Sequence, residues 1–347
     1  MARPGWLTLV IAVATLASAC SGSPSASTST SVAGSTGPET DWVVAVEDAI
    51  GFMEANHYRR ADFDWVDIRS RAIRLVTEHP SQANASEGVR RAALATGSSY
   101  APAALLQADR RPDLLYPSRP PGGRRLAGDI GYLDFAVGSD NLETFTGDVR
   151  RLVEFIDRDP VCGWVIDLRE TPIGDLPGEI AALNPILGEG TVFGVERSDG
   201  TEAWTIDGGE LLIDGEPTDA KAGPGYAVHR PNAPVAILTS SYTDRAGTLL
   251  VVAFAGRPHT LAFGEPTGAN TLIYERFVLP DGAQLDVPSG ATYDRLGRRF
   301  ERITLPPDQI VLVAPDGRGD AVLEAATDWL NSTDPCASAA KQRDSDA

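Results

Sequence analysis

The sequence predicts an α/β protein preceded by a helical region, and three stretches of pattern carry this prediction. Over residues 41–109 apolar side chains recur every three to four positions, which is typical of amphipathic helices. Over residues 126–332 short apolar runs alternate with helical segments, which indicates a parallel sheet connected by helices. Residues 20–40 are almost entirely Ser, Thr, Gly, Ala and Pro, a composition that buries too little apolar surface to fold.

The composition is that of a globular chain with an acidic surface. Its 347 residues are 42% apolar and 22% charged, which excludes collagen-like, coiled-coil and wholly disordered proteins. The formal net charge is -18, which repels phosphate backbones, so we expect no nucleic-acid partner. Only Lys221 and Lys341 are lysines, so chemistry that needs a lysine has just these two positions.

The N-terminus has the pattern of an export signal. Arg3 precedes an apolar run over residues 6–16, which is too short to span a membrane. Cys20 follows three small residues, as in bacterial lipoproteins, where this cysteine is acylated after cleavage. We therefore expect a signal peptide over 1–19, a tether over 20–40, and attachment to the outer face of the cell membrane through the lipid anchor only. Plain secretion with a free thiol at Cys20 is the alternative.

Two further cysteines, Cys162 and Cys336, remain in the body of the chain. Disulfides persist outside the cytoplasm, so we expect a bridge between them, with a buried thiol and an exposed thiol as the alternative. The histidines, at positions 57, 79, 229 and 259, form no i, i+4 pair and have no cysteine at zinc-ligand spacing. We expect neither a metal nor a cofactor.

The elements are expected in a simple order. The annex over 41–109 should hold helices near 43–53, 68–76 and 86–95, the last capped by Ser86, and a connecting loop should follow over 110–125. In the core over 126–332 we expect strands at 130–135, 163–168, 191–197, 203–206, 235–239, 260–263, 277–279 and 284–287, the last two forming a hairpin. Helices are expected at 142–158, 175–187, 247–255 and 320–330, with a polar tail over 333–347.

Five short motifs follow one another in the second half of the chain. They are GWVIDLR (163–169), PILG (185–188), VAILTSSYT (235–243), FGEPT (263–267) and LPDGA (279–283). In this order they resemble the tail-specific, or C-terminal-processing, serine protease family over about residues 126–330. The resemblance implies a crotonase-like ββα core behind the helical annex. The chain has no room for the peptide-binding PDZ insert of many family members.

The position of the family's nucleophile holds a residue that cannot attack a carbonyl. In the family the serine lies in a turn resembling Thr-Ala-Ser-Ser-Gly-Glu, directly after the Val-Ala-Ile-Leu-Thr strand. Here that turn is TDRAGT (243–248), and Arg245 takes the place of the serine. A guanidinium stays protonated and has no free lone pair, so it is no nucleophile.

The base and the oxyanion loop also depart from the family pattern. Asn270 stands where one branch has a lysine, and Ser98 stands where another branch has a histidine at the end of the annex. Only the glutamate of that second branch is kept, as Glu275. In the oxyanion loop, ETPIGD (170–175), only Gly174 survives, and its expected partner is the backbone of Ala246. Proline and isoleucine in this loop make close approach of two amides to a substrate oxygen unfavourable.

These departures predict a pseudoprotease, a member of the protease fold without activity, whose cleft binds a peptide or a protein C-terminus. Arg245 would then pair with a ligand carboxylate, or alternatively with Glu275 or Asp244 inside the protein. A second hypothesis is an active serine endopeptidase that uses Ser240 or Ser241 with a histidine such as His229 or His259. A third is a structural envelope lipoprotein with a closed cleft.

Overall fold

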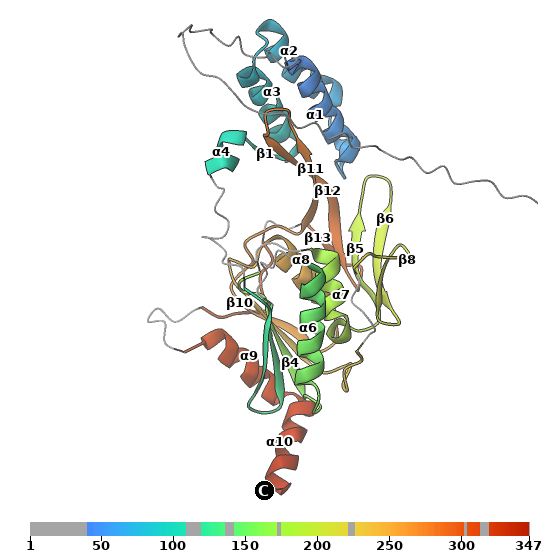
Figure 1. The fold of residues 1–347 in the computed structure, drawn as a ribbon, viewed down its shortest axis with the longest axis vertical. Helices are drawn as coiled ribbons and strands as arrows, with labels where there is room; N and C mark the ends of the chain where they lie inside the picture. The colour runs from blue at the N-terminus through green and yellow to red at the C-terminus, as the bar shows by residue number, and fades with distance from the viewer. Residues whose placement is uncertain are drawn as a thin grey trace, which may run out of the picture. The chain divides into compact units, whose positions relative to one another are not determined.

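The computed structural model describes residues 40–346, apart from 109–118, 136–141, 172–174, 221–225, 302–303 and 313–318. Two β-sheets with their helices form the α/β core that the sequence predicts, and a helical annex precedes it (Figure 1). Cys20, with the expected signal peptide and tether, and Gly174 lie outside the described residues. No helix in the described ranges has the length and apolar character needed to cross a membrane.

The elements are as follows. The helices are α1 (Trp42–Asn56), η1 (Arg60–Asp62), α2 (Trp65–Glu78), α3 (Gln82–Thr96), α4 (Ala103–Ala108), α6 (Leu142–Ile156), α7 (Leu176–Leu187), α8 (Arg245–Phe254), α9 (Ala321–Ser332) and α10 (Asp334–Asp346). The strands are β1 (Ser99–Ala101), β2 (Gly122–Leu126), β3 (Ile130–Asp134), β4 (Gly163–Asp167), β5 (Gly190–Glu196), β6 (Thr201–Asp207), β7 (Glu210–Ile213), β8 (Glu216–Pro217), β9 (Val235–Thr239), β10 (Thr260–Gly264), β11 (Leu272–Val278), β12 (Gln284–Asp294), β13 (Arg299–Phe300) and β14 (Gln309–Ile310).

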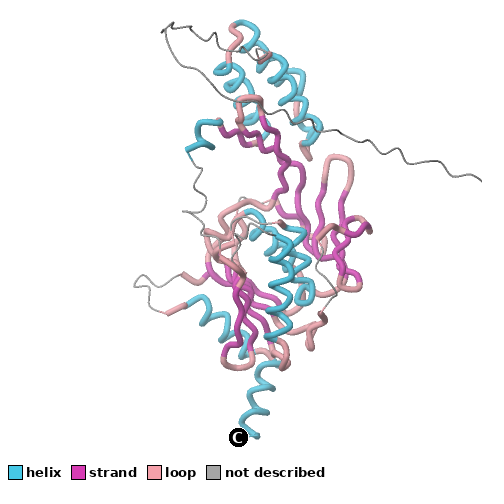
Figure 2. The backbone as a smooth tube through the Cα atoms, in the orientation of Figure 1, coloured by secondary structure: helices cyan, strands magenta, loops and turns pink. Residues whose placement is uncertain are grey.

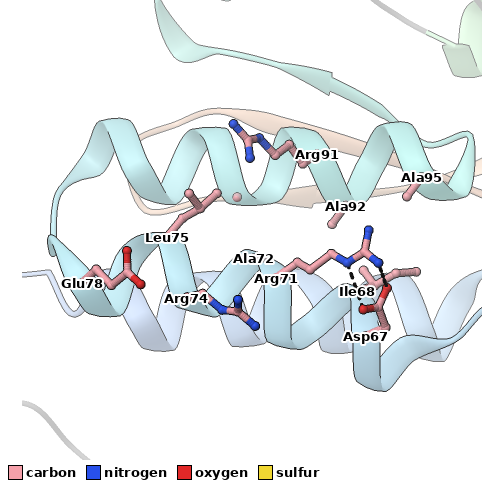
Figure 3. A pocket seen from close by; sticks show the side chains of 11 residues that line it. Asp67, Ile68, Arg71, Ala72, Arg74, Leu75, Glu78, Arg91, Ala92 and Ala95 are labelled. Carbon is pink, nitrogen blue, oxygen red and sulfur yellow. Dashed lines mark hydrogen bonds and ion pairs between the residues drawn. The ribbon is translucent and has the colours of Figure 1, made fainter.

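The annex is a three-helix unit in which α2 and α3 approach closely. A Cβ on Gly88 would lie 2.9 Å from the carbonyl oxygen of Ala72, so the glycine lets the two backbones meet. Figure 3 shows the groove between these helices, with Ala72, Leu75 and Ala92 facing inward and the Arg71–Asp67 ion pair at one end. Small residues therefore make the close contact between α2 and α3, while large side chains such as Ile50, Met53 and Trp65 fill the rest of the annex core.

Helix α3 begins four residues earlier than the sequence indicates. Ser81 is its N-cap, and its hydroxyl accepts a hydrogen bond from the Asn84 backbone N–H at 3.2 Å, so the expected cap at Ser86 is wrong. The four residues between the two serines, Gln-Ala-Asn-Ala, include no large apolar side chain, so the apolar pattern does not indicate the start of the helix. Gly97 ends the helix with a φ of 73°, as a C-terminal glycine does.

The six-stranded sheet has the order β14-β10-β9-β4-β3-β2 and is parallel except for β2. Both faces are covered, which explains why its central strands are continuous apolar runs. Trp164 and Ile166 of β4 point to the core under α6, α7 and α8, whereas Val165 joins the cluster under α9. Figure 1 shows these helices on the two sides of the sheet.

The second sheet has the order β1-β12-β5-β6-β7-β8, and β11 and β13 also pair with β12. The predicted hairpin exists, with the Leu279 N–H donating to the Ala283 carbonyl at 2.9 Å across the turn. Its strands are longer than predicted, and the ribbon they form leads from the annex toward the six-stranded sheet (Figure 2). Leu285 and Val287 of β12 belong to the same apolar cluster as Ile50 of α1, so the annex and the core share this ribbon.

Two segments form regular structure that the sequence does not indicate. The end of the expected loop over 110–125 is strand β2, whose Gly-Gly-Arg-Arg sequence lacks strand alternation and which pairs only with β3. The expected polar tail over 333–347 contains helix α10, which has few apolar residues. In both segments partners elsewhere in the fold impose the structure, which outweighs weak local propensity.

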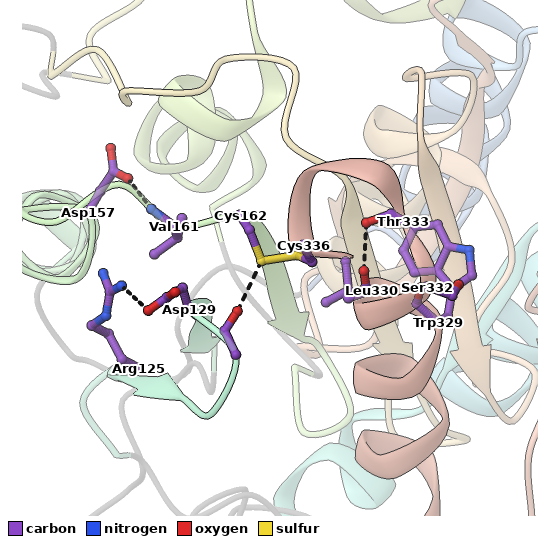
Figure 4. The surroundings of a disulfide bond; sticks show 11 residues. Arg125, Asp129, Asp157, Val161, Cys162, Trp329, Leu330, Ser332, Thr333 and Cys336 are labelled. Atoms are coloured by element: carbon purple, nitrogen blue, oxygen red, sulfur yellow. Dashed lines mark hydrogen bonds and ion pairs between the residues drawn. A yellow bond between two sulfur atoms is a disulfide. The ribbon is translucent and has the colours of Figure 1, made fainter. Parts of the chain in front are cut away.

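A disulfide holds α10 against the six-stranded sheet. Cys162, directly before β4, is bonded to Cys336, and their Cα atoms lie 4.9 Å apart (Figure 4). Both cysteines are buried in the cluster that contains Leu330 of α9. The bridge therefore attaches a polar helix that has little apolar surface of its own.

Glu179 in α7 is a buried carboxyl group without a hydrogen-bond partner. Its residue is 1% exposed, and neither carboxyl oxygen has a partner in the part of the chain that the structure describes. Burial, and to a lesser degree the nearby Asp175 carboxylate, raise the pKa of Glu179 to about 8. The folded protein therefore keeps a proton on this group at neutral pH, whereas the unfolded chain does not.

This difference predicts a pH-dependent stability. Between about pH 4.5 and 8 the folded state binds the proton that the unfolded chain has released, so the free energy of unfolding falls as pH rises, by up to about 1.4 kcal/mol per pH unit. Denaturant titrations across this range should show the fall in the wild type, and Glu179→Gln should remove it. The exposed Glu189→Gln is the control, and an identical slope in all three proteins would contradict the assignment.

Candidate functional site

The site lies where three parallel strands of the six-stranded sheet end. β4 is followed by the turn that contains Thr171, β9 by residues 240–244, and β10 by residues 265–270. Loops at the carboxyl ends of parallel strands meet at one edge of the sheet, which is where ligands bind in such sheets. The three turns place Arg245, Asn270 and the start of β11 around one cavity.

Backbone contacts hold these turns together. A Cβ on Gly247 would lie 2.4 Å from the Thr171 carbonyl oxygen, and a Cβ on Gly268 would lie 2.1 Å from that of Ser241. Each contact has a backbone hydrogen bond beside it, because Asp244 N–H donates to Thr171 at 3.1 Å and Gly268 N–H donates to the Thr243 carbonyl at 2.8 Å. A side chain at either glycine would force the turns apart.

Arg245 begins α8 in a strained conformation. Its φ is 40°, in the left-handed region that non-glycine residues rarely adopt. Asp244 caps the helix and accepts the Arg245 backbone N–H at 2.8 Å. The side chain of Arg245 is exposed and lines the cavity. The structure therefore keeps the sharp turn before the helix although the residue in it is an arginine.

Neither of the expected internal ion pairs forms. The Arg245 guanidinium pairs with no carboxylate in the described ranges of the chain. Glu275 lies 3.8 Å from Arg197 instead, measured between Oε1 and Nη1. Asp244 uses its carboxylate as the helix cap. Arg245 is thus a cation directed into the cavity without a counter-ion from these residues.

The cavity has a volume of about 700 Å³ and is partly apolar. Its lining residues are Ser99, Leu176, Val195, Arg197, Trp204, Asp244, Arg245, Ala246, Leu249, Gly268, Ala269, Asn270, Leu272, Ile273, Tyr274, Arg276 and Asp286. Two of its three arginines are paired, Arg276 with Asp286 at 2.6 Å and Arg197 with Glu202 at 3.1 Å. The hypothesis of a structural lipoprotein expects a closed cleft, whereas the described residues leave this cavity open.

The end of the annex contributes Ser99 rather than Ser98 to the cavity. Ser98 is 8% exposed, and its hydroxyl lies 2.9 Å from that of Thr96, inside the annex. Ser99 is the first residue of β1, and its register partner is Asp286, which also lines the cavity. Successive residues in an extended chain point in opposite directions. Ser98, which the family comparison selects, therefore faces the annex, whereas Ser99 faces the cavity.

Asn270 has a structural role in the loop before β11. Its side-chain amide donates to the Tyr274 hydroxyl at 2.6 Å, and its oxygen accepts the Leu272 backbone N–H at 3.0 Å. Burial raises the pKa of the Tyr274 phenol, which keeps it neutral at physiological pH. Neither group can serve as the base that the family lysine supplies.

Neither alternative serine forms a hydrogen bond with a histidine in the described ranges of the chain. The Ser240 hydroxyl donates to the Arg169 carbonyl at 2.6 Å and accepts the Tyr242 N–H at 3.0 Å, so it stabilises the turn. His259 accepts the Val235 N–H through its carbonyl, at the opposite end of β9, about 13 Å away for a five-residue strand. His229 is held by Asp157 at 3.1 Å. Ser241 is exposed, and its N–H contacts Glu265 at 3.4 Å.

The described lining of the cavity offers few other groups that could take part in catalysis. No histidine or lysine is among the described residues that line the cavity. His57, the buried annex histidine, binds the Thr96 carbonyl at 2.9 Å, and burial lowers its pKa. Ala246 lines the cavity, and its backbone N–H, in the first turn of α8, forms no hydrogen bond with the described residues. The described ranges also hold no cluster of three potential metal ligands.

The two sheets, the annex and the sharp turn before α8 define a serine peptidase fold of the tail-specific type. The model for Peptidase family S41 matches residues 129–311, which is more than half of the chain. The chain belongs to peptidase family S41.

Individual proteins are similar to the chain in sequence or in fold. The nisin-resistance protein of Lactococcus lactis subsp. lactis is 28% identical over 147 residues, which are 42% of this chain and 45% of that protein. The chain therefore matches less than half of that relative's length. A lipoprotein from Streptococcus agalactiae has a similar structure, with a TM-score of 0.65 at 22% identity over 85% of this chain and 97% of its own. The photosystem II D1 C-terminal processing protease has a TM-score of 0.58 at 14% identity, over 86% and 99% of the two chains.

The strained backbone at Arg245 yields a prediction about stability. Glycine adopts a positive φ without steric cost, so Arg245→Gly should raise the free energy of unfolding by about 0.5–1 kcal/mol. Arg74→Gly, at an exposed position inside α2, is the matched control and should lower it by about 1 kcal/mol. Urea denaturation measures both. A loss of stability in Arg245→Gly as large as in the control would show that the left-handed backbone is not strained.

Proposed function

We propose that the protein is a non-catalytic member of the family whose cavity binds the C-terminal carboxylate of a peptide or protein. The observation that supports this most directly is Arg245, an exposed guanidinium that lines the cavity and pairs with no described carboxylate. Guanidinium and carboxylate groups match in charge and geometry and form two parallel hydrogen bonds. The Ala246 N–H, at the start of α8 beside Arg245, forms no hydrogen bond with the described residues and is a second donor for the same anion.

The lack of a nucleophile and base supports a binding function over hydrolysis. Peptide cleavage needs an activated nucleophile and a proton acceptor in contact with it. The described residues of the cavity supply the hydroxyls of Ser99 and Tyr274, and the only carboxylates are those of Asp244, which caps α8, and Asp286, which pairs with Arg276. With Arg245 at the nucleophile position, the cavity keeps the shape of a substrate site and lacks its chemistry.

Peptide binding is tested with short peptides that differ only at the C-terminus. By calorimetry we expect a free acid to bind at least 10-fold more tightly than its amide, because the amide loses the charged partner of Arg245. Arg245→Gln should remove this difference, and Arg74→Gln, in the annex, should keep it. Equal affinity for acid and amide would exclude carboxylate recognition.

Hydrolysis is measured on the same peptides. Mass spectrometry should detect no cleavage products, and a serine-reactive phosphonate should not label the protein. Labelling that Ser240→Ala or Ser241→Ala abolishes would establish an active peptidase and overturn the proposal.

We further propose that the protein is held at the extracytoplasmic face of the cell membrane by a lipid on Cys20. The support is the export pattern of residues 1–19, the small residues before Cys20, and the likeness to a streptococcal lipoprotein. In a bacterial host, Cys20→Ala should move the exported chain from the membrane fraction to the soluble fraction, since one lipid-bearing residue supplies the anchor. Cys336→Ala, which removes a different cysteine, should stay with the membrane. Unchanged fractionation of Cys20→Ala would exclude this anchor.

A further inference from the structure

Strand β11 has one edge without a partner strand in the described part of the chain. It pairs with β12 along its whole length, and no other strand pairs with it. Its other substantial packing partner is α1. Tyr274 and Val278 on this strand are 36% and 57% exposed. The strand is therefore long, partly apolar and open along one side.

An open edge of this kind is a template for another strand. Along the free side of β11, backbone N–H and C=O groups project at alternate residues, and an extended peptide can pair with them. Proteins usually shield such edges with charges, prolines or short strands, because an open edge recruits other chains. The seven residues of β11 include no proline, and its two charged side chains have partners, since Arg276 pairs with Asp286 of β12 and Glu275 lies 3.8 Å from Arg197.

The two ends of β11 lie at different places in the fold. Leu272 and Ile273, at its beginning, line the same cavity as Arg245. Phe277, near its end, packs against Phe52 of α1 with ring centroids 5.3 Å apart. The strand therefore runs from the cavity to the annex, and the ribbon in Figure 2 follows this course.

We infer that the peptide of the proposed function binds as an additional strand antiparallel to the free edge of β11. This inference rests on that function, because it takes the carboxylate position at Arg245 as given. A peptide antiparallel to β11 runs from the annex toward the cavity and delivers its last residue to Arg245. A parallel peptide would place its carboxylate at the other end of the strand, beside Phe277 and Phe52 and away from Arg245.

The geometry also defines the length and character of the bound segment. At about 3.4 Å per residue, the seven residues of β11 accommodate an extended segment of about six residues. The side chain of the last peptide residue would lie in the cavity, against Trp204, Leu249 and Ile273. An apolar C-terminal residue is therefore favoured. Chains with a flexible, extended C-terminus fit this site, whereas a C-terminus folded into a helix does not.

The strand geometry is tested with seven-residue free-acid peptides that end in leucine and carry one N-methyl group at successive backbone positions. N-methylation removes a hydrogen-bond donor and leaves the side chain unchanged. In calorimetry the affinity should fall at least 10-fold at alternate positions and change less than threefold between them, because only alternate amides face β11.

The polarity is tested with a photoreactive benzophenone at the N-terminus of the unmethylated peptide. Crosslinks should map to α1 or to residues 277–283. Crosslinks to α7 or to residues 190–213 would overturn the antiparallel arrangement, and equal tolerance of N-methylation at every position would overturn strand pairing. Both results leave carboxylate binding intact if the free acid still binds better than the amide. Absence of binding by every peptide overturns the proposed function and this inference together.

Discussion

The site depends on backbone atoms that touch one another where the parallel strands end. Gly247 against Thr171, Gly264 against Thr239 and Gly268 against Ser241 leave no room for a Cβ, and hydrogen bonds between the same turns hold them in register. Because main-chain atoms make these contacts, the shape of the site does not depend on the catalytic side chains. A substitution of a side chain in these turns therefore changes the chemistry of the cavity and leaves its walls in place.

The backbone at Arg245 also follows the surrounding turns rather than the preference of its own side chain. A positive φ is unfavourable for arginine, and the surrounding turns impose it nevertheless. Strain at a position usually marks a function that the surroundings are built to support. The turn before α8 presents this cation to the cavity. The neighbouring charges leave it available, because Glu275 pairs with Arg197 and Asp286 pairs with Arg276.

The sequence predicts the core well and the details of the site less well, for physical reasons. Central strands such as β4 and β9 are buried on both faces, so each is a continuous apolar run that the sequence shows directly. β2 and α10 have no such signal, since pairing with β3 and the Cys162–Cys336 bridge impose them. Arg245 and Asn270, which the order of the motifs selects, both line the cavity. The same order selects Ser98, whereas Ser99, the first residue of β1, lines the cavity. It also does not identify Arg197 as the neighbour of Glu275, because the two residues come from segments far apart in the sequence.

The ribbon of β11 and β12 contributes both to the cavity and to the core of the annex. One part of it forms a wall of the cavity, and another part lies within the apolar cluster of the annex through Leu279, Leu285 and Val287. A force applied to one part is therefore transmitted to the other along continuous backbone. The annex helices therefore support the cavity wall through this shared ribbon.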